Sequence, residues 1–577
     1  MLALNRPAFN SGLRDSTPAL GGSRDPLHLA PAASAAQPRA LAVDLRRFPG
    51  IRALAADYTG AFDALAPFFA GDPARPEAWG AAVARAQAHG RDRNALASVI
   101  ADQQRRRGAP APAVAAGGRL ADPRSVAVVT GQQAGLFGGP HFTLLKALTA
   151  LRLAERVARE HGVPAVAVFW IDAEDHDWEE VRSCAVLDHE LARHIVSLGR
   201  PDGAGTRPIA GIALDESIDA ALASLARLLP ATDASSDLFG ALRNAYSAGR
   251  GMAEAFGRWL EAVLGDRGLV VYDASDPAAK PLARDVFARE IEEPGLTARL
   301  AAEAGTALGG LGYHAQVAPQ EHVAALFLLD GGRQPIRAAG DRFLAGEAEV
   351  AGRTLRARAR AHPEDFSPNV LLRPVVQDTL FPTVAYVAGP NELAYLGQLK
   401  GVYERFGVPM PLVVLRSSAT LVDSAAMRFL NRYPFPFERL QIGDESLLNH
   451  LLASHLPPSV EQALEGASVA IDGRMTALIE AVPAIDPTLE GAARSTLGRM
   501  QHDLRSLQAK IIHAAKRRDE TLRRQFHRTR SQAFPEGIPQ ERGVGFVYFL
   551  NQYGPALVGR LLEDLPLDPG RHWVLAI

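Results

Sequence analysis

The chain has 577 residues, of which 47% are hydrophobic and 22% are charged, proportions typical of a soluble globular protein. That length exceeds one compact core, so we expect two or three domains. The formal net charge of −2 indicates neither a nucleic acid nor a membrane surface as partner. The single cysteine excludes an internal disulfide framework, and it excludes zinc-finger or iron–sulfur sites built from the chain's own thiolates. No stretch approaches the roughly 20 apolar residues of a membrane helix and the first residues lack a secretory signal, so we expect a cytoplasmic protein.

Residues 1–40 are rich in Ala, Pro, Gly and Ser without a sustained hydrophobic period, which predicts a disordered leader. An α/β core is expected over 41–455. From about Ser125 onward, short apolar runs alternate with helical segments of ten or more residues, the pattern of a parallel sheet covered on both faces. Such sheets bind ligands beyond the carboxyl ends of their strands. The expected strands are 126–131, 166–171, 268–273, 383–389 and 410–420.

Two regions interrupt this alternation, 188–235 and 316–360. We interpret both as insertions into the core that wall or cover a site. Within the second region, strand-like residues flank the Gly331–Gly332 pair, which predicts a β-hairpin.

Residues 456–530 carry apolar positions at alternating spacings of three and four, which is typical of an antiparallel coiled-coil hairpin. A continuous helix over 488–530 would extend roughly 65 Å at 1.5 Å per residue, too far for a compact core to cover. We therefore expect a homodimer through this arm, and residues 531–577 are expected to return to the core. The apolar positions are Leu464, Ala467, Ile471, Met475, Leu478 and Val482, then Leu497, Met500, Leu504, Leu507, Ile511 and Ala514.

The strand at 126–131 runs into a glycine-rich loop and then into a long amphipathic helix that begins near His141. α/β proteins hold phosphates and other anions with this arrangement, and glycines permit close backbone approach to a ligand. The loop is neither a Walker A motif nor GxGxxG, and the alternative reading is a tight turn without a ligand. The candidate binding residues are Thr130, Gly131, Gln132, Gln133, Gly135, Gly139, Thr143 and Lys146.

A second polar loop follows the strand 166–171, in which Trp170 is a further candidate binding residue. Four titratable residues stand there in succession, and alternate residues of an extended segment face the same way, so the first with the third, or the second with the fourth, could converge. Such groups could orient an amine, act as a general base or hold Mg²⁺. The alternative is a solvated acidic loop in which an aspartate caps the next helix. No zinc-site spacing is present, so no metal ligand is assigned. The predicted catalytic residues are Glu174, Asp175, His176 and Asp177.

A third polar segment follows the strand 383–389. Glu392 could anchor a substrate ammonium, although an acid favoured by the helix dipole is at least as good an interpretation. Arg373 could bind a carboxylate or a phosphate, or pair with Asp378. The candidate binding residues of this region are Arg373, Gly389, Asn391, Glu392, Tyr395 and Gln398.

Five segments of the chain match a family pattern in register: TGQQAGLFGGPHFTLLK, FWIDAEDHD, GYHAQV, AYVAGPNELAYLGQL and FPEGIPQERGVGFVYFLNQYG. Through them the chain resembles the bacillithiol biosynthesis cysteine-adding enzyme family from about residue 41 to the C-terminus. The resemblance implies a Rossmann-like core of the nucleotidylyltransferase type, with connecting-peptide insertions and a dimerising coiled coil. It also implies a ligase that joins the cysteine carboxyl group to the amine of glucosaminyl-malate, the last step towards bacillithiol. The HIGH and KMSKS signatures of class I aminoacyl-tRNA synthetases are absent, which weakens the case for their adenylate mechanism.

The mechanistic hypothesis is that ATP, with Mg²⁺, activates the cysteine carboxylate while its phosphates lie near the glycine-rich loop and Lys146. A carboxylate or His176 of the second loop would take the proton from the attacking amine, and Arg373 or Lys146 would bind the malyl carboxylates. Two other functions stay open on these residues. One is a non-catalytic scaffold of a thiol pathway that acts through the coiled coil, and the other is a metal-dependent hydrolase that uses residues 174–177.

Overall fold

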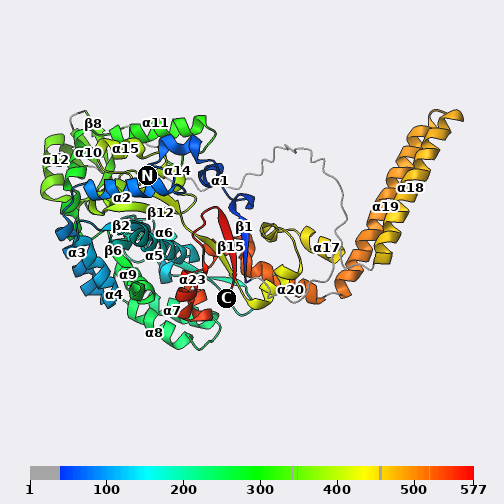
Figure 1. The fold of residues 1–577 in the computed structure, drawn as a ribbon, viewed down its shortest axis with the longest axis horizontal. Coiled ribbons are helices and arrows are strands. Elements are labelled where there is room, and N and C mark those ends of the chain that lie inside the picture. The colour runs from blue at the N-terminus through cyan, green and yellow to red at the C-terminus, as the bar shows by residue number, and fades with distance from the viewer. Residues whose placement is uncertain are drawn as a thin grey trace. The chain divides into compact units, whose positions relative to one another are not determined.

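The computed structural model describes residues 39–577 except 319, 321, 341, 347, 454–457 and 519 (Figure 1). Residues 1–38 of the predicted leader therefore lie outside the described residues. Within the described part, five parallel strands form a central sheet in the order β13-β12-β2-β3-β6, which confirms the predicted parallel sheet. Its strands are β2 (Val126–Gln133), β3 (Ala165–Asp172), β6 (Val270–Asp273), β12 (Thr383–Ala388) and β13 (Leu412–Leu415).

Both faces of this sheet are covered by helices, and alternate strand residues enter two different hydrophobic clusters. Val128 and Phe169 belong to a cluster that includes α2, α5 and α9, whereas Val129 and Val168 belong to one that includes α3, α10, α13 and α15. Burial on both faces explains why the strands are apolar at nearly every position. These helices are α2 (Pro76–Ala88), α5 (His141–His161), α9 (Met252–Leu264), α3 (Arg93–Arg107), α10 (Arg284–Glu292), α13 (Arg373–Leu380) and α15 (Lys400–Phe406).

The strand order reverses direction between β2 and β12. From β2 the chain adds β3 and then β6 on one side, and it later adds β12 and then β13 on the other. In open α/β sheets a ligand site forms at such a switch point, beyond the carboxyl ends of the strands, because the connections leave in opposite directions there.

The stretch 410–420 was expected as one strand, and this prediction is wrong. The chain leaves the parallel sheet after β13 and enters a second sheet at β14 (Ser418–Val422), which pairs with β15 (Arg571–Ala576) and through it with β1 (Ala40–Asp44). The break occurs because Arg416 binds Glu541 and the Ser417 N–H donates to Thr149 Oγ1 at 3.0 Å. The helices α16 (Ser424–Arg432), α17 (Ser446–Ala453) and α20 (Glu520–Ala533) share a hydrophobic cluster with this sheet.

The two interrupting regions contain their own sheets. The predicted hairpin around Gly331–Gly332 is confirmed, since β7 and β8 pair antiparallel on either side of it. The second region contributes β7 (Val323–Leu329), β8 (Arg333–Ala339), β9 (Arg342–Ala345) and β10 (Ala348–Ala351) to a sheet that β11 (Phe366–Pro368), just beyond the region, completes, and α11 (Leu296–Gly310) and α12 (Gly352–Ala361) lie beside it in the chain. The first region starts in the turn between β4 (Ser183–Leu187) and β5 (Arg193–Ser197), which pair as a hairpin, and continues through α7 (Ser217–Leu228) to the start of α8 (Ser235–Ala245). The elements therefore extend beyond the expected bounds of both regions.

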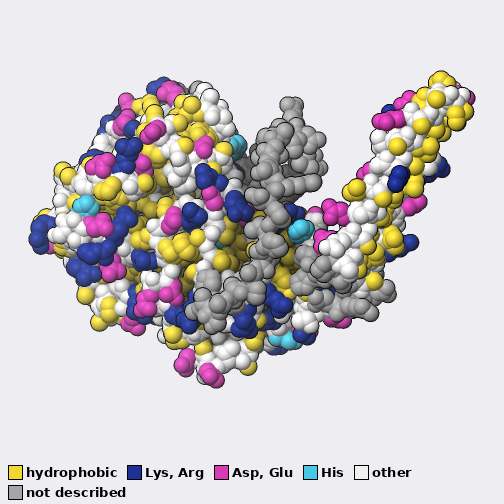
Figure 2. Space-filling model, turned by 45° about the vertical axis from the view of Figure 1, so that its right-hand side comes forward, with side chains coloured by type: hydrophobic (Ala, Val, Ile, Leu, Met, Phe, Trp, Pro, Cys, Tyr) yellow, Lys and Arg dark blue, Asp and Glu magenta, His cyan; other side chains and the backbone are white. Residues whose placement is uncertain are grey.

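A two-helix hairpin of α18 (Pro458–Ala481) and α19 (Leu489–Arg518) forms the coiled coil. Gln501 Nε2 donates to Asp472 Oδ1 across the pair at 2.8 Å. The helix expected over 488–530 corresponds to α19 and α20 on either side of residue 519, which lies outside the described residues. Part of the apolar series stays exposed in the single chain, as Figure 2 shows along this hairpin. The exposed fractions within the series are 48% for Leu478, 39% for Met500 and 50% for Leu507. Val469, which lies outside the series, is 66% exposed.

The remaining described α-helices are short and lie around the core. No helix in the described part of the chain has the length and apolar character to cross a membrane. These helices are α1 (Ala53–Gly60), α4 (Ala111–Gly118), α6 (Trp178–Val181), α14 (Leu393–Leu396), α21 (Gln540–Gly543), α22 (Phe546–Tyr553) and α23 (Ala556–Asp564).

Candidate functional site

The carboxyl ends of β2, β3 and β12 bring most of the predicted site residues to one edge of the central sheet. β2 pairs with β3 on one side and with β12 on the other, so the segments that follow these strands are neighbours. Thr130 lies deeper, where its hydroxyl donates to the Val387 carbonyl at 3.0 Å. That bond joins β2 to β12, so Thr130 holds the two strands of the switch point together.

Lys146 links the two sides of the switch point. Its ammonium group is fully buried, donates to the Gly131 carbonyl at 2.8 Å and to Gln132 Oε1 at 3.2 Å, and forms an ion pair with Glu392. Burial lowers the pKa of Lys146, and the charge of Glu392 opposes that effect. Two residues predicted to bind substrate separately therefore bind each other.

Glu392 stands at the surface end of this pair, with 22% of its side chain exposed. Its carboxylate also accepts from the Gly389 N–H at 3.0 Å and from the Tyr386 hydroxyl at 3.1 Å. Asn391, beside it, is exposed. The segment after β12 is thus ordered around one carboxylate that water and ligands can reach.

The glycine-rich loop is packed tightly, which favours a structural role for some of its glycines. Gly139 has φ +73°, and a Cβ on Gly135 would lie 3.0 Å from the Gly139 Cα, so side chains are disfavoured at both positions. The C-terminal segment holds the outside of the loop, since the His141 N–H donates to the Val544 carbonyl at 2.8 Å. At the start of α5 the Thr143 hydroxyl is buried and has no hydrogen-bond partner among the described residues. The loop therefore ends in an unused donor at a helix N-terminus, where anions bind favourably.

Arg373 and Asp172 form the second charged pair of the edge. Arg373 Nε lies 3.8 Å from Asp172 Oδ2, and 34% of the Asp172 side chain is exposed. Arg373 Nη2 donates to the Tyr395 hydroxyl at 3.5 Å, and its guanidinium lies 6.0 Å from the Trp170 ring centroid. The ion-pair partner is thus Asp172 and not Asp378. Burial raises the pKa of Asp172, against the opposing charge of Arg373.

Glu174 points away from solvent. It forms a buried ion pair with Lys280, and Lys280 Nζ also donates to the Phe366 carbonyl at 3.2 Å. Burial raises the pKa of Glu174, against the charge of Lys280. This pair connects the second loop to β11.

Asp175 accepts hydrogen bonds from several elements at once. Gln133 Nε2 donates to it at 3.0 Å and Arg333 Nη1 at 3.1 Å, while the His176 ring nitrogen lies 3.3 Å away. Burial acts against the charge on Asp175, but the hydrogen bond from His176 and the charge of Arg333 outweigh it and lower the pKa of Asp175 to about 2. Asp175 therefore stays ionised and fixes the end of β2 against β8.

The predicted convergence within residues 174–177 is not what the structure has. Glu174 pairs with Lys280, whereas the predicted partner His176 has its ring nitrogen 3.3 Å from Asp175. Asp177 does not turn to Asp175 but caps α6 by accepting from the Glu180 N–H at 3.2 Å, which was the alternative interpretation. Across the described ranges, no three His, Cys, Asp or Glu side chains converge as metal ligands would.

Gln398 lies outside the cluster. Its buried amide donates to the carbonyls of Ala301 and Val317, both at 3.1 Å, and accepts from the Val317 N–H at 3.2 Å. It fixes the chain that leads into the 316–360 region and does not face the other candidates.

Comparison with known families decides which proteins share this architecture. Residues 41–417 match the family model described as "Bacillithiol biosynthesis BshC, N-terminal Rossmann-like domain", and residues 419–577 match its C-terminal coiled-coil domain. The chain belongs to the BshC family. The resemblance, the Rossmann-like fold class and the coiled coil are thereby confirmed. The two family domains meet where β13 passes into β14, whereas the sequence expectation had the core running to 455.

Three curated relatives match between 78% and 91% of this BshC-family chain, and each carries the name "Putative cysteine ligase BshC". One from Salinibacter ruber is 36% identical over 528 residues, which are 90% of this chain and 95% of the relative. One from Symbiobacterium thermophilum is 32% identical over 553 residues, 91% and 98% of the two chains. One from Koribacter versatilis is 34% identical over 457 residues, 78% and 84%.

One cation of this BshC-family site comes from the coiled-coil domain, and sequence reasoning missed it. The Arg542 guanidinium lies 5.8 Å from the Phe142 ring centroid, and Arg416 lies 5.5 Å from the same ring. Arg416 is occupied by Glu541, but Arg542 is exposed and has no ion-pair partner among the described residues. The motif FPEGIPQERGVGF was noted for the family resemblance and not for chemistry. Its one adjacent charged pair, Glu541 followed by Arg542, was the available signal.

Four other residues at this edge were also missed. Asp172 directly follows a recognised strand, so its place was open to prediction, and Tyr386 lies inside a strand. Lys280 and Arg333 come from segments more than 100 residues away from their acidic partners. No local pattern marks such partners, because the tertiary fold alone brings them together.

Proposed function

We propose that this protein is a cysteine ligase of bacillithiol biosynthesis that joins the cysteine carboxyl group to the amine of glucosaminyl-malate. Family membership and the ligase names of its relatives support this proposal. The observation that carries it is the Asp172–Arg373 pair at the switch point, in which the Asp172 carboxylate is accessible, beside the pair of the buried Lys146 with Glu392. Cysteine carries an ammonium and a carboxylate group, and an amino sugar linked to a dicarboxylate carries an amine and two carboxylates. This edge of the sheet likewise has both carboxylate and cationic side chains to meet them.

Amide formation requires an activated carboxyl group and a neutral amine. In the proposed reaction the cysteine carboxylate attacks a phosphorus of ATP. Attack on the α-phosphorus releases pyrophosphate and gives an acyl-adenylate, from which the amine later expels AMP. Attack on the γ-phosphorus releases ADP and gives an acyl-phosphate, from which the amine later expels phosphate. The start of α5, with the unused Thr143 hydroxyl, is the proposed place for the phosphates. The amine nitrogen then attacks the acyl carbon and loses a proton.

Asp172 is the proposed acceptor of that proton. A general base acts best when its pKa approaches the working pH, and burial raises the pKa of Asp172 while its side chain stays accessible. Arg373 and Arg542 are the proposed cations for the substrate carboxylates, because Lys146 is already held by Glu392. This assignment replaces Lys146 with Arg542 in the role of carboxylate ligand.

Purified protein supplied with cysteine, glucosaminyl-malate and ATP is expected to yield the amide product together with AMP or ADP. Mass spectrometry detects the product and the nucleotide. Asp172→Asn should slow product formation by about 10²- to 10⁴-fold, the usual contribution of a general base. Asp215→Asn is the matched control, since Asp215 is an exposed carboxylate that accepts from the Ser217 N–H before α7. Folded wild-type protein that forms no product with any nucleotide would overturn the proposal.

We further propose that the protein is a homodimer through the α18–α19 hairpin. Leu507 and Leu478 of the apolar series are 50% and 48% exposed there, and burying such a stripe is the usual reason for coiled-coil pairing. Light scattering should therefore give twice the 61.6 kDa chain mass for the wild type and a monomer for Leu507→Glu. Arg505→Glu, about 200° around the helix, is the control that should stay dimeric. A monomeric wild type at micromolar concentration would contradict this.

A further inference from the structure

The loop between β3 and α6 is held by both inserted regions. From the first inserted region, the Ile209 N–H donates to the Asp175 carbonyl at 2.7 Å and the Ala210 N–H donates to the Ala173 carbonyl at 2.9 Å. From the second inserted region, Arg333 at the start of β8 donates from Nη1 to Asp175 Oδ1 at 3.1 Å. The two insertions therefore meet at one loop of the candidate site, and the first holds its backbone while the second holds a side chain.

Arg333 is itself fixed by three further contacts. Its Nη2 donates to the Pro368 carbonyl at 2.8 Å, and its guanidinium lies 4.0 Å from the Phe327 ring centroid. Its backbone N–H donates to the Thr206 carbonyl in the first inserted region at 3.3 Å. Only 10% of the Arg333 side chain is exposed. The position of its guanidinium is therefore set by the sheet of the second inserted region, and the planar group reaches Asp175 from a fixed place.

Asp175 passes this anchoring on to two side chains of the polar edge. Its Oδ2 accepts from Gln133 Nε2 at 3.0 Å, and Gln133 is the last residue of β2. Its Oδ1 accepts from the His176 N–H at 2.8 Å, and the His176 ring nitrogen lies 3.3 Å from the same oxygen. The His176 side chain is 47% exposed, so ligands can reach it. Both oxygens of Asp175 are engaged by the protein's own donors, which suits a residue that positions its neighbours.

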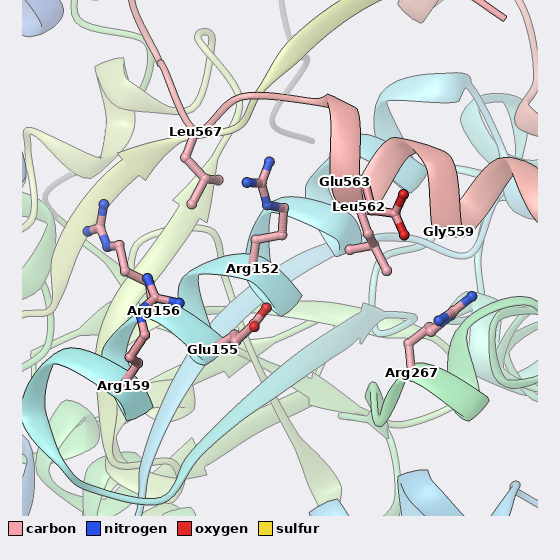
Figure 3. Close-up of a pocket in the computed structure, with 9 residues that line it drawn as sticks. All are labelled: Arg152, Glu155, Arg156, Arg159, Arg267, Gly559, Leu562, Glu563 and Leu567. Carbon is pink, nitrogen blue, oxygen red and sulfur yellow. The ribbon is translucent and has the colours of Figure 1, made fainter.

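The inserted regions act on this edge of the sheet and not on the cavity drawn in Figure 3. That cavity, of about 520 Å³, lies between the later turns of α5, the 3₁₀ turn Gly265–Arg267 and α23. Its described lining residues come from these three elements and from Leu567, so they lie outside both inserted regions. The contacts of Arg333 therefore concern the candidate site alone.

We propose that Arg333 is a positioning residue of the ligase site, which anchors Asp175 to the second inserted region and through Asp175 holds Gln133 and His176 at the polar edge. Its effect on the rate rests on the proposed ligase function, whereas its effect on the loop does not. Misplacing reacting groups by about 1 Å can cost about 100-fold in rate, so an insertion that touches no substrate can still control the reaction. The backbone bonds from Ile209 and Ala210 remain when Arg333 is replaced, so the loop should stay folded but be less firmly held.

Steady-state kinetics of the full-length protein tests the effect on the rate. Arg333→Gln is expected to lower kcat about 10- to 100-fold while KM for cysteine stays within about threefold, because Arg333 and Asp175 contact protein groups and not substrate. Arg337→Gln is the matched control, since Arg337 is an exposed arginine on the same strand, and it should keep the wild-type kcat. A KM that rises while kcat stays unchanged would overturn the positioning role and make Arg333 a substrate ligand.

A double-mutant cycle shows whether Arg333 acts through Asp175. Asp175→Asn should lower kcat at least as much as Arg333→Gln does. The double variant Arg333→Gln/Asp175→Asn should be within about twofold of the slower single variant, because changes at two ends of one contact do not add. Losses that multiply in the double variant would overturn the proposal, since Arg333 would then act through another contact.

Hydrogen–deuterium exchange of the same proteins, followed by mass spectrometry, tests the anchoring without any enzyme assay. Arg333→Gln should speed exchange severalfold in the peptide that contains the His176 amide, because that amide donates to Asp175. If this variant does not fold, Arg333→Lys replaces it, and the same pattern is expected with smaller changes. Unchanged exchange in the folded variant overturns the positioning role whatever the activity. A folded wild type that forms no product with any nucleotide refutes the ligase proposal instead and leaves this measurement valid.

Discussion

Lys146→Met is expected to reduce kcat/KM of the proposed ligase reaction by about 100-fold, the cost of misplacing reacting groups by about 1 Å. Lys146 is the one contact described here that joins Gly131 and Gln132, at the end of β2, to Glu392 after β12. Without it, both segments lose their common anchor, and the substrate groups between them lose their alignment. The measurement is steady-state kinetics of cysteine-dependent product formation on protein verified as folded by circular dichroism.

Stability and catalysis are separable in this experiment. Lys146→Met leaves Glu392 without its cation, whereas Lys146→Met/Glu392→Gln removes both charges and should recover stability without recovering the rate. Arg107→Met is the matched control, because Arg107 forms a buried ion pair with Glu261 at 2.8 Å on the α3 and α9 helices. It should lower stability but leave kcat/KM of the folded fraction within a few fold. A Lys146→Met enzyme as fast as the wild type would mean that the anchor has no role in catalysis.

Arg416→Ala is expected to destabilise the protein by about 3–5 kcal/mol, the cost of leaving a buried charge without its partner. Arg416 donates to both oxygens of Glu541, at 2.9 and 2.6 Å, and Ser418 donates to the same carboxylate at 2.8 Å. His572 extends this network, with its Nδ1 at 2.7 Å from Ser418 Oγ. The pair is buried where the parallel sheet passes into the second sheet, so water cannot replace the lost guanidinium.

Urea unfolding followed by circular dichroism measures this effect. Arg494→Ala is the control, because its ion pair with Glu490 is exposed, at 66% and 44%, and should contribute only about 0.5 kcal/mol or less. Replacing both partners, Arg416→Met with Glu541→Leu, should recover much of the loss. Equal unfolding midpoints for Arg416→Ala and Arg494→Ala would show that the buried pair does not stabilise the junction.

The same pair has a consequence at low pH. Burial disfavours the charge on Glu541, but Arg416 outweighs that effect and lowers the pKa of Glu541 to about 2. A carboxyl group whose pKa is lower in the folded than in the unfolded chain stabilises the fold above its ordinary pKa of about 4.3. That contribution disappears as the pH falls from about 4 towards 2.

The parallel sheet was predictable because its signal is local. Strands such as β2 and β3 are apolar on both faces, a pattern confined to eight residues each, and the helix after β2 begins at the predicted residue, His141. The coiled coil was equally readable from its spacing. The stretch 410–420 was misread because it also has the composition of a single buried strand. What divides it is the contact of Arg416 with Glu541, 125 residues away.

The candidate site was predictable in position but not in its contacts. The polar segments after β2, β3 and β12 do meet at one edge, as the strand order requires. The sequence held no sign that Lys146 would pair with Glu392, 246 residues on, or that Glu174 would turn inward to Lys280. Such pairings depend on which charges share a buried environment, and burial is a property of the assembled chain.

The amino-acid sequence alone was therefore enough to determine the class of the fold, the BshC family resemblance and the edge of the sheet that carries polar residues, because periodicity and motif order are local properties. Only the tertiary structure decided that the glycine-rich loop after β2 is closed from outside by the C-terminal segment, and that Lys146 serves as an anchor between two strands. It also decided that Arg542 of the coiled-coil domain reaches the same edge as Arg373 of the Rossmann-like domain. The physical reason is that charged side chains are stabilised by partners in space, whose distance along the chain leaves no trace in the local sequence.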